Sequence, residues 1–146
     1  MNRGLLLASV LLAIASSAPA AGNSAVVTHA WVRWLPGDLP AGGYAVIANR
    51  GDDAMRLIGA DSPDYGMVML HRSLHHDGVE RMQTVDAVVV PAHGTALLAP
   101  GGYHLMLMHP LHAIMPGDSV RVRLYFAGGA ALSVEFPVRP ATAQGD

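Results

Sequence analysis

The chain has 146 residues, a length that suits one domain rather than two. Hydrophobic residues make up 51% of it and charged residues 14%, which excludes disorder as a description of the whole chain. With a formal net charge of −2 and no basic cluster, nucleic acid is not an expected partner. The absence of cysteine excludes a thiolate nucleophile, an iron–sulfur cluster, a thiolate zinc site and a blue-copper site.

Residues 1–20 are predicted to be a cleaved secretory signal peptide. Arg3 precedes an apolar run over residues 5–14, and Ala18-Pro19-Ala20 supplies the small residues that a signal peptidase requires. The run is shorter than the ~20 residues of a bilayer span. Cleavage after Ala20 is therefore favoured over a retained N-terminal anchor, and no stable membrane insertion is expected afterwards.

The rest of the chain is predicted to form short strands separated by turns. In chain order, the expected strands cover residues 26–33, 43–48, 55–60, 67–71, 79–85, 88–90, 95–98, 103–108, 119–126 and 132–138. The intervening segments are rich in turn residues, and Asp77-Gly78 is a strong hairpin signal. No convincing helical stripe is present. The pattern predicts a single all-β domain, a sandwich or barrel, over residues 21–138, with a short flexible tail over 139–146.

Histidine and methionine gather on two of the predicted strands. Met67, Met69 and His71 alternate along one strand, and a second strand carries the run His104-Leu105-Met106-Leu107-Met108. Because successive side chains of a strand point to opposite faces, each alternating set shares one face. A two-residue turn at Asp77-Gly78 would also pair His71 with Thr84. Met82 would then be a diagonal neighbour of His71, ~7–8 Å away, provided that this register holds.

Imidazole and thioether without carboxylate or thiolate form a specific ligand set. Soft thioether sulfur prefers copper(I), whereas zinc sites use Cys, His or carboxylate, and calcium and magnesium require oxygen ligands. An uncharged ligand set also leaves the charge of the ion uncompensated, which costs less for a monovalent ion. The cluster therefore favours copper(I).

Methionine on a strand is more often a core filler than a ligand. On that ground Met67 and Met69 are expected to line the core beneath the site, while for Met108 a core role and a ligand role are equally open. Met55 and Met115 are expected to be structural, and Trp31 is expected in the core.

Other histidines lie near the cluster in sequence. His75 and His76 sit at the predicted hairpin tip, and His109 and His112 follow the second strand. Together with Met108, His75, His76 and His109 are possible accessory ligands. An exposed loop position without a metal role is the favoured interpretation for these histidines.

Taken together, the residues resemble the signature of the periplasmic copper A chaperones, PCu(A)C. That signature is a His, ten residues, a Met, twenty-one residues and His-x-Met, which His71, Met82, His104 and Met106 match. The flanking segments Ala30-Trp31-Val32-Arg33, Gly43-Tyr44, Pro100-Gly101-Gly102 and Gly117-Asp118 also fit. The resemblance spans about residues 26–138.

The resemblance implies a cupredoxin-like Greek-key β-sandwich in the periplasm that binds one copper(I) through these four side chains. It also implies delivery to the copper A centre of cytochrome c oxidase subunit II, directly or through a thiol-bearing assembly factor. Some members carry a His- and Met-rich C-terminal tail, but residues 139–146 contain neither residue type. A tail site is therefore not expected.

Three alternatives stay open at this point. An enzyme would need an open coordination position and a nearby acid or base, and the sequence offers neither; no catalytic residue is predicted. A copper storage or detoxification protein is a second possibility, although a single site makes a poor store. The third is an exported β-sandwich binding module with no metal role.

Overall fold

The computed structural model describes residues 24–145, so the predicted signal peptide lies outside the described residues. The described part consists of strands joined by turns, and no helix in it has the length and apolarity of a membrane span. The strands are β1 (Ala25–Arg33), β2 (Ala41–Asn49), β3 (Met55–Asp61), β4 (Tyr65–His76), β5 (Val79–Thr84), β6 (Val88–Val90), β7 (Thr95–Leu98), β8 (Tyr103–Pro110), β9 (Ser119–Phe126) and β10 (Ala131–Arg139). The all-β prediction is confirmed.

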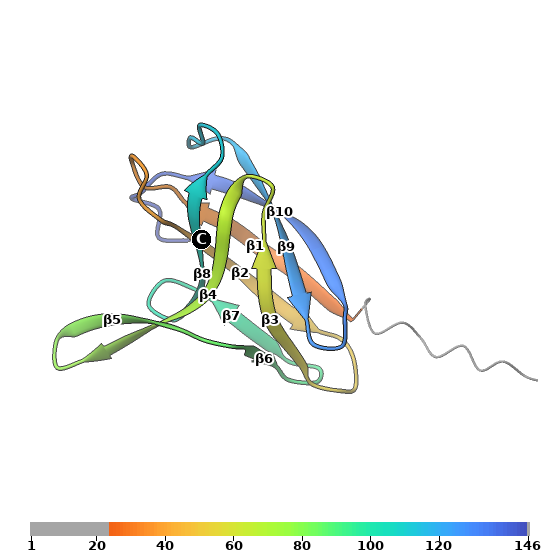
Figure 1. Cartoon of the computed structure of the whole chain (residues 1–146). Coiled ribbons are helices and arrows are strands. Elements are labelled where there is room, and N and C mark those ends of the chain that lie inside the picture. The colour runs from red at the N-terminus through yellow and green to blue at the C-terminus, as the bar shows by residue number, and fades with distance from the viewer. Residues whose placement is uncertain (1–23, 146) are drawn as a thin grey trace, which may run out of the picture.

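The strands form one hydrogen-bonded succession that folds over into two layers (Figure 1). Its order is β5-β4-β8-β7-β2-β1-β10-β9-β3-β6, with β2 also pairing with β8. The first layer runs from β5 to β1 and the second from β10 to β6. The parallel pairing of β1 with β10 joins them, through Val32 opposite Val138.

The core lies between the layers and follows from strand alternation. On β9, the side chains at 120, 122, 124 and 126 are buried while those at 119, 121 and 123 are exposed. From the first layer, β4 contributes Leu70 and β8 contributes Leu105 and Leu107. Each fully buried aliphatic side chain stabilises the fold by about 1.5–3 kcal/mol relative to an exposed one.

β4 is longer than the strand predicted over residues 67–71. It continues to His76 and pairs with β5 as far as His76 opposite Val79. Asp77 and Gly78 have φ values of 52° and 75°, the two successive positive values of a type I′ hairpin turn. The resulting β4–β5 arm extends away from the sandwich (Figure 1), and every residue of β5 is exposed. The sequence prediction ended the strand too early because the residues of the arm do not contact the core, so they show no alternation of apolar and polar residues that would indicate its full length.

A bulge in β1 decides the position of Trp31. The register of β1 against β2 shifts between Thr28 and Trp31, and His29 has a φ of 51°. Trp31 is buried, with 5% of its surface exposed, but it lies on the opposite face from the core residue Val32. Trp31 is therefore buried, as predicted, but outside the cluster between the layers: its ring packs against Tyr44, 4.7 Å between centroids, on the outer face.

The segment after β10 passes over this outer face. Arg33 Nε donates a hydrogen bond to the carbonyl oxygen of Ala143 at 3.1 Å, and the guanidinium groups of Arg33 and Arg139 each lie 5.4 Å from the Trp31 ring centroid. Cation–π attraction of this kind holds charged groups over an apolar ring. Trp31 is thus covered by polar side chains and the C-terminal segment instead of by the second layer.

Candidate metal site

The outer face of the first layer carries the predicted ligands on three adjacent strands. β4 lies between β5 and β8, and His71 pairs with Thr84 on one side and with His104 on the other. The predicted register of the hairpin is confirmed. Met82 lies opposite Ser73, two residues along β5 from Thr84, and so shares a face with Thr84. It is therefore a diagonal neighbour of His71, as predicted from the two-residue turn.

His104 is held with one ring nitrogen available. Only 4% of its surface is exposed, and its Nδ1 donates a hydrogen bond to the carbonyl oxygen of Gly102 at 3.1 Å. Because a carbonyl oxygen can only accept, the neutral ring carries its proton on Nδ1 and a lone pair on Nε2. His104 Nε2 is buried and has no hydrogen-bond partner. This atom is therefore fixed in position and ready to bind an electron-pair acceptor.

His71 presents a second unpartnered nitrogen. Its Nε2 lies 3.3 Å from Thr84 Oγ1, and its Nδ1 is buried without a partner. When Nε2 donates to the hydroxyl group, Nδ1 presents a lone pair. Burial, and then repulsion from His104, lower the pKa of His71, so its ring is neutral at pH 7.

The two imidazoles form an edge-to-face pair with 5.8 Å between ring centroids. A buried polar atom left without a hydrogen bond costs about 1–3 kcal/mol. Two such atoms side by side are therefore unfavourable in the apoprotein, and a metal ion bound by both would remove that cost. The donor set fits a soft, monovalent ion because imidazole nitrogens bind as uncharged ligands and the nearest side chains along the strands are thioethers.

Thioethers extend the site along β4 and β8. Met106 lies opposite Met69, and Met108 lies opposite Met67, on the face of the histidine pair. Met82 is the outermost predicted ligand, with 57% of its surface exposed. The structure therefore brings all four predicted ligands to one face and places Met82 at its edge.

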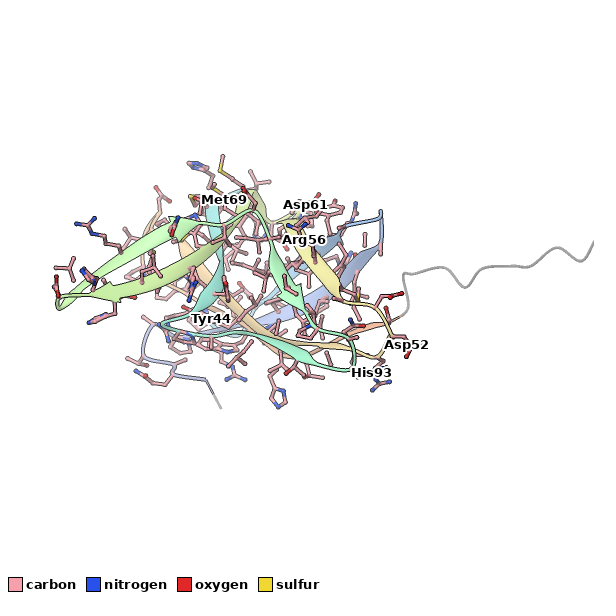
Figure 2. The ribbon with its side chains drawn as sticks, turned by 90° about the horizontal axis from the view of Figure 1, so that it is seen from below. Tyr44, Asp52, Arg56, Asp61, Met69 and His93 are labelled. Carbon is pink, nitrogen blue, oxygen red and sulfur yellow. The ribbon has the colours of Figure 1, made fainter. Side chains whose placement is uncertain are left out.

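The expectation that Met67 and Met69 line the core is wrong. The intervening residues Val68 and Leu70 face the core, and Leu105 and Leu107 meet them from β8. Met67 is 46% exposed and Met69 is half-buried on the outer face (Met69 is labelled in Figure 2). Alternation had already placed both residues on the face of His71; preferring the common core role of methionine over that alternation caused the error.

Tyr44, which the sequence offers only as a residue flanking the signature, forms one wall of the site. The ring of Tyr44 on β2 lies 6.3 Å from that of His104 (Tyr44 is labelled in Figure 2), and burial raises the pKa of its phenol. A Cβ atom at Gly42 would lie 2.5 Å from Tyr44 Oη, so the phenol occupies the space that a side chain at position 42 would fill. Gly42 pairs with Met106, which places this phenol next to that methionine.

The accessory candidates are dispersed. Met108 shares the face of the site, two positions along β8 from Met106. His75, opposite Glu80, is on the same face farther along the arm, as a diagonal neighbour of Met82. His76 is at the arm tip, where its Nε2 lies 3.2 Å from Asp77, with both side chains 88% exposed.

Two histidines lie elsewhere. His109 is across from Gly66, whose Cβ position would be 3.2 Å from His109 Cβ, so it lies on the face opposite to Met108. His112 Nε2 lies 2.8 Å from Asp64 Oδ1 and its Nδ1 donates to the Ala113 carbonyl oxygen. Both ring nitrogens of His112 are therefore engaged. Within residues 24–145, moreover, no group of three or more His, Asp or Glu side chains is arranged to hold a metal ion.

Comparisons with known proteins agree with this geometry. The family model described as LpqE-like, "Putative lipoprotein LpqE-like", matches residues 25–138. A protein of Leifsonia xyli subsp. xyli named "Putative lipoprotein Lxx21020" is 32% identical over 114 residues, which cover 77% of this chain and 68% of that protein.

Solved structures of PCuAC domains share the fold. The apo PCuAC domain of PmoF2 is 26% identical with a TM-score of 0.69, over 85% of this chain and 96% of that domain. The copper-bound PCuAC domain of PmoF2 is 25% identical with a TM-score of 0.66, over 81% of this chain and 94% of that domain. The copper(I) form of DR1885 from Deinococcus radiodurans is 27% identical with a TM-score of 0.62, over 86% of this chain and 81% of that protein. The cupredoxin-like β fold expected from the sequence is confirmed.

Proposed function

The chain belongs to the LpqE-like family, and on that premise we propose that it is an exported copper(I) carrier that binds one ion between His71, His104, Met106 and Met82. One observation carries the proposal: two buried imidazole nitrogens without partners lie side by side on a face lined with thioethers. Solved relatives with the same fold include copper-bound forms, which supports copper as the ion.

The two histidine ligands are held in position, whereas the ligand Met82 is exposed and free to move. His104 is oriented by the Gly102 carbonyl oxygen and His71 by the Thr84 hydroxyl group, so both nitrogens are held in place before the ion arrives. Met82 is on the exposed β5 of the arm and can detach at little cost. A site that gives up one uncharged ligand easily favours transfer of the ion over tight retention.

The receiving protein in this proposal is subunit II of cytochrome c oxidase, at its copper A centre, or a thiol-bearing assembly factor. Thiolate is a stronger ligand for copper(I) than thioether, so the ion moves toward such an acceptor. The exposed edge at Met82 and Thr84 is where an acceptor reaches the ion. The proposed location is the periplasm; the relative in Leifsonia xyli carries the name of a lipoprotein, which supports export.

The proposal assigns transport of the ion to this protein and no catalytic turnover. Copper storage is the competing function, and stoichiometry distinguishes the two because a store requires many ions per chain. No observation favours the enzyme alternative: the predicted ligands are imidazole and thioether groups, and within residues 24–145 no group of three or more His, Asp or Glu side chains is arranged to hold a catalytic metal ion.

The test is an anaerobic copper(I) titration against a chromophoric chelator. The wild-type protein is expected to bind tightly at the His–Met site, and the double variant Met82→Leu, Met106→Leu to lose that tight binding while keeping its fold. Met115→Leu is the matched control, because Met115 is 62% exposed and outside this face. Equal binding by the double variant would overturn the proposed ligand set.

Transfer is tested separately. The copper-loaded protein is mixed with the reduced, copper-free domain of subunit II, the two are separated, and copper is measured in each. Copper that stays on the carrier would reject this acceptor while leaving the binding site intact, and copper recovered on subunit II would support delivery.

A further inference from the structure

Five methionines lie on the outer face, more than a single His–Met site uses. Met69 and Met106 form the cross-strand pair next to the histidine pair, and Met67 and Met108 form the following pair toward the start of β4. Met82 is on the other side of the histidines. Along β4 and β8, the cross-strand pair of histidines is therefore followed by two successive cross-strand pairs that consist only of methionines.

The spacing of these rows allows three sulfur atoms to reach one ion. Directly opposed residues on neighbouring antiparallel strands have Cβ atoms about 4.5–5.5 Å apart, and diagonal neighbours are within reach of long side chains. Met67 and Met108 are directly opposed, and Met69 is diagonal to Met108 on the same face. Methionine is unbranched with three rotatable bonds, so its sulfur adjusts without backbone movement.

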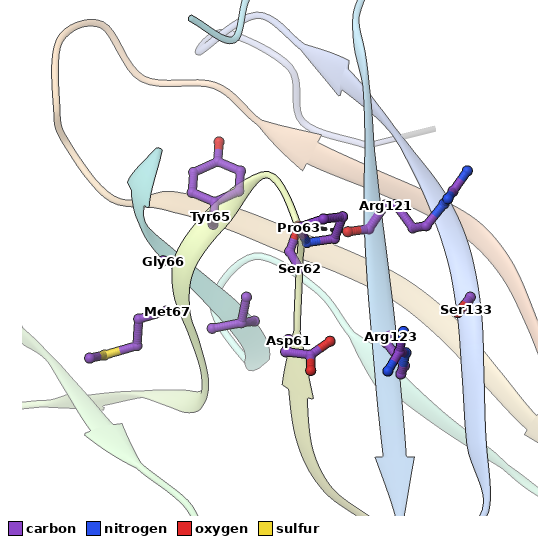
Figure 3. A pocket seen from close by; sticks show the side chains of 10 residues that line it. Asp61, Ser62, Pro63, Tyr65, Gly66, Met67, Arg121, Arg123 and Ser133 are labelled. Carbon is purple, nitrogen blue, oxygen red and sulfur yellow. Dashed lines mark hydrogen bonds between the residues drawn. The ribbon is translucent and has the colours of Figure 1, made fainter. Parts of the chain in front are cut away.

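Packing does not account for these side chains. Met67, Met69 and Met108 are absent from the cluster between the layers and from the apolar residues packed against it. Met67 exposes 46% of its surface, and its side chain points away from Asp61 and Arg123 in the adjoining pocket (Figure 3). These thioethers therefore contribute little to the core and have no carboxylate among them.

We propose that Met67, Met69 and Met108 form a second, thioether-only site for copper(I), which adjoins the His–Met site through Met106. Uncharged thioether sulfur selects soft monovalent ions over zinc, calcium and magnesium. With no imidazole, the second site is the weaker of the two. It provides a position from which an ion passes to Met106 by ligand exchange, without a change of oxidation state. This site extends the proposed carrier function but does not require His71 or His104.

Silver(I) is a suitable probe because it is soft, monovalent and not oxidised in air. The protein is labelled with ¹³C at the methionine methyl groups and titrated with silver(I) while methyl resonances are recorded. The first equivalent is expected to shift Met106 and Met82, and the second to shift Met67 and Met108. Met55 and Met115 serve as internal controls outside the face. If Met67 and Met108 stay unshifted through the second equivalent, the second site does not exist.

Two variants separate this proposal from the carrier function. Met67→Leu, Met69→Leu, Met108→Leu is expected to bind one silver(I) fewer than the wild type while the Met82 resonance still shifts. His71→Gln, His104→Gln is expected to lose the first binding step while Met67 and Met108 still respond. Unchanged stoichiometry in the triple variant would overturn the second site alone. Tight binding that survives in the histidine variant would count against the carrier site alone.

Discussion

The phenol of Tyr44 lies directly over Gly42, so closely that a Cβ atom at position 42 would approach Tyr44 Oη to 2.5 Å and Cζ to 2.9 Å. The aromatic ring is rigid and buried between Trp31 and His104, so it cannot give way cheaply. Position 42 therefore controls the wall that shields the histidine pair.

Gly42→Ala is expected to displace Tyr44 and open His104 to water. We expect a loss of about 1–3 kcal/mol in the free energy of unfolding, the usual cost of overpacking, together with weaker copper(I) binding. Urea denaturation and the chelator titration measure the two effects. Gly59→Ala is the matched control, because a Cβ atom at Gly59 meets nothing within 4 Å. Equal stability of the two variants would show that Tyr44 moves freely.

Thr84→Val is expected to weaken metal binding with little loss of stability. The substitution keeps the shape of the side chain and removes the hydroxyl group 3.3 Å from His71 Nε2. Loss of a group that orients a histidine ligand typically costs about 10–100-fold in metal affinity. The chelator competition provides the measurement, and Thr95→Val on the exposed side of β7 is the control. An affinity within twofold of the wild type would mean that Thr84 does not orient the ring.

The Asp64–His112 pair is expected to stabilise the fold only within a limited range of pH. Burial alone would raise the pKa of Asp64, but hydrogen bonds from His112 and from the backbone of Arg121 lower it below 3.8 overall. The hydrogen bonds of His112 to Asp64 and to the Ala113 carbonyl oxygen raise the pKa of His112 above 6.5. The contribution of Asp64 is present above pH 3.8 and lost as pH falls through its folded-state pKa.

The contribution of His112 is complete below pH 6.5 and lost as pH rises through its raised pKa. The wild type should therefore exceed His112→Gln in stability most clearly between these two values. Thermal unfolding of both proteins across pH 3 to 9 measures the difference. A difference that stays constant across this range would mean that the pair is not charged.

Leu107→Ala is expected to cost about 2–5 kcal/mol in the free energy of unfolding, as for other large-to-small core substitutions. Leu107 is fully buried on β8 between Met106 and Met108, so it anchors the strand that carries both methionines. Leu97→Ala, at a position 61% exposed, provides the control and should change stability far less. Denaturant unfolding of both variants makes the comparison.

Much of the site followed from local pattern. The Asp77-Gly78 turn predicted the pairing of His71 with Thr84, and alternation predicted that His104 and Met106 share a face. Both are short-range consequences of backbone geometry, because a two-residue turn determines the register of its hairpin. Pairing between β4 and β8, which brings His71 opposite His104, could not be derived this way, since no turn links these strands.

Longer-range features were missed or misassigned for the same reason. Tyr44 reaches the site because β2 pairs with β8, and Trp31 is buried on the outer face instead of between the layers because β1 bulges beside His29. Met69 was expected in the core although its alternation with His71 pointed to the outer face. The general preference of methionine for cores is a weaker predictor of its position than its alternation with a histidine along one strand.

The sequence by itself determined the positions of most strands, the hairpin register and the imidazole and thioether residue types of the site, because these depend on neighbours a few positions away. Tertiary structure alone decided which strands lie side by side, which face is covered, and that one ring nitrogen of His71 and one of His104 stay without a partner. Those properties depend on pairings between distant segments, whose choice is made by the burial of the whole core rather than by any local signal.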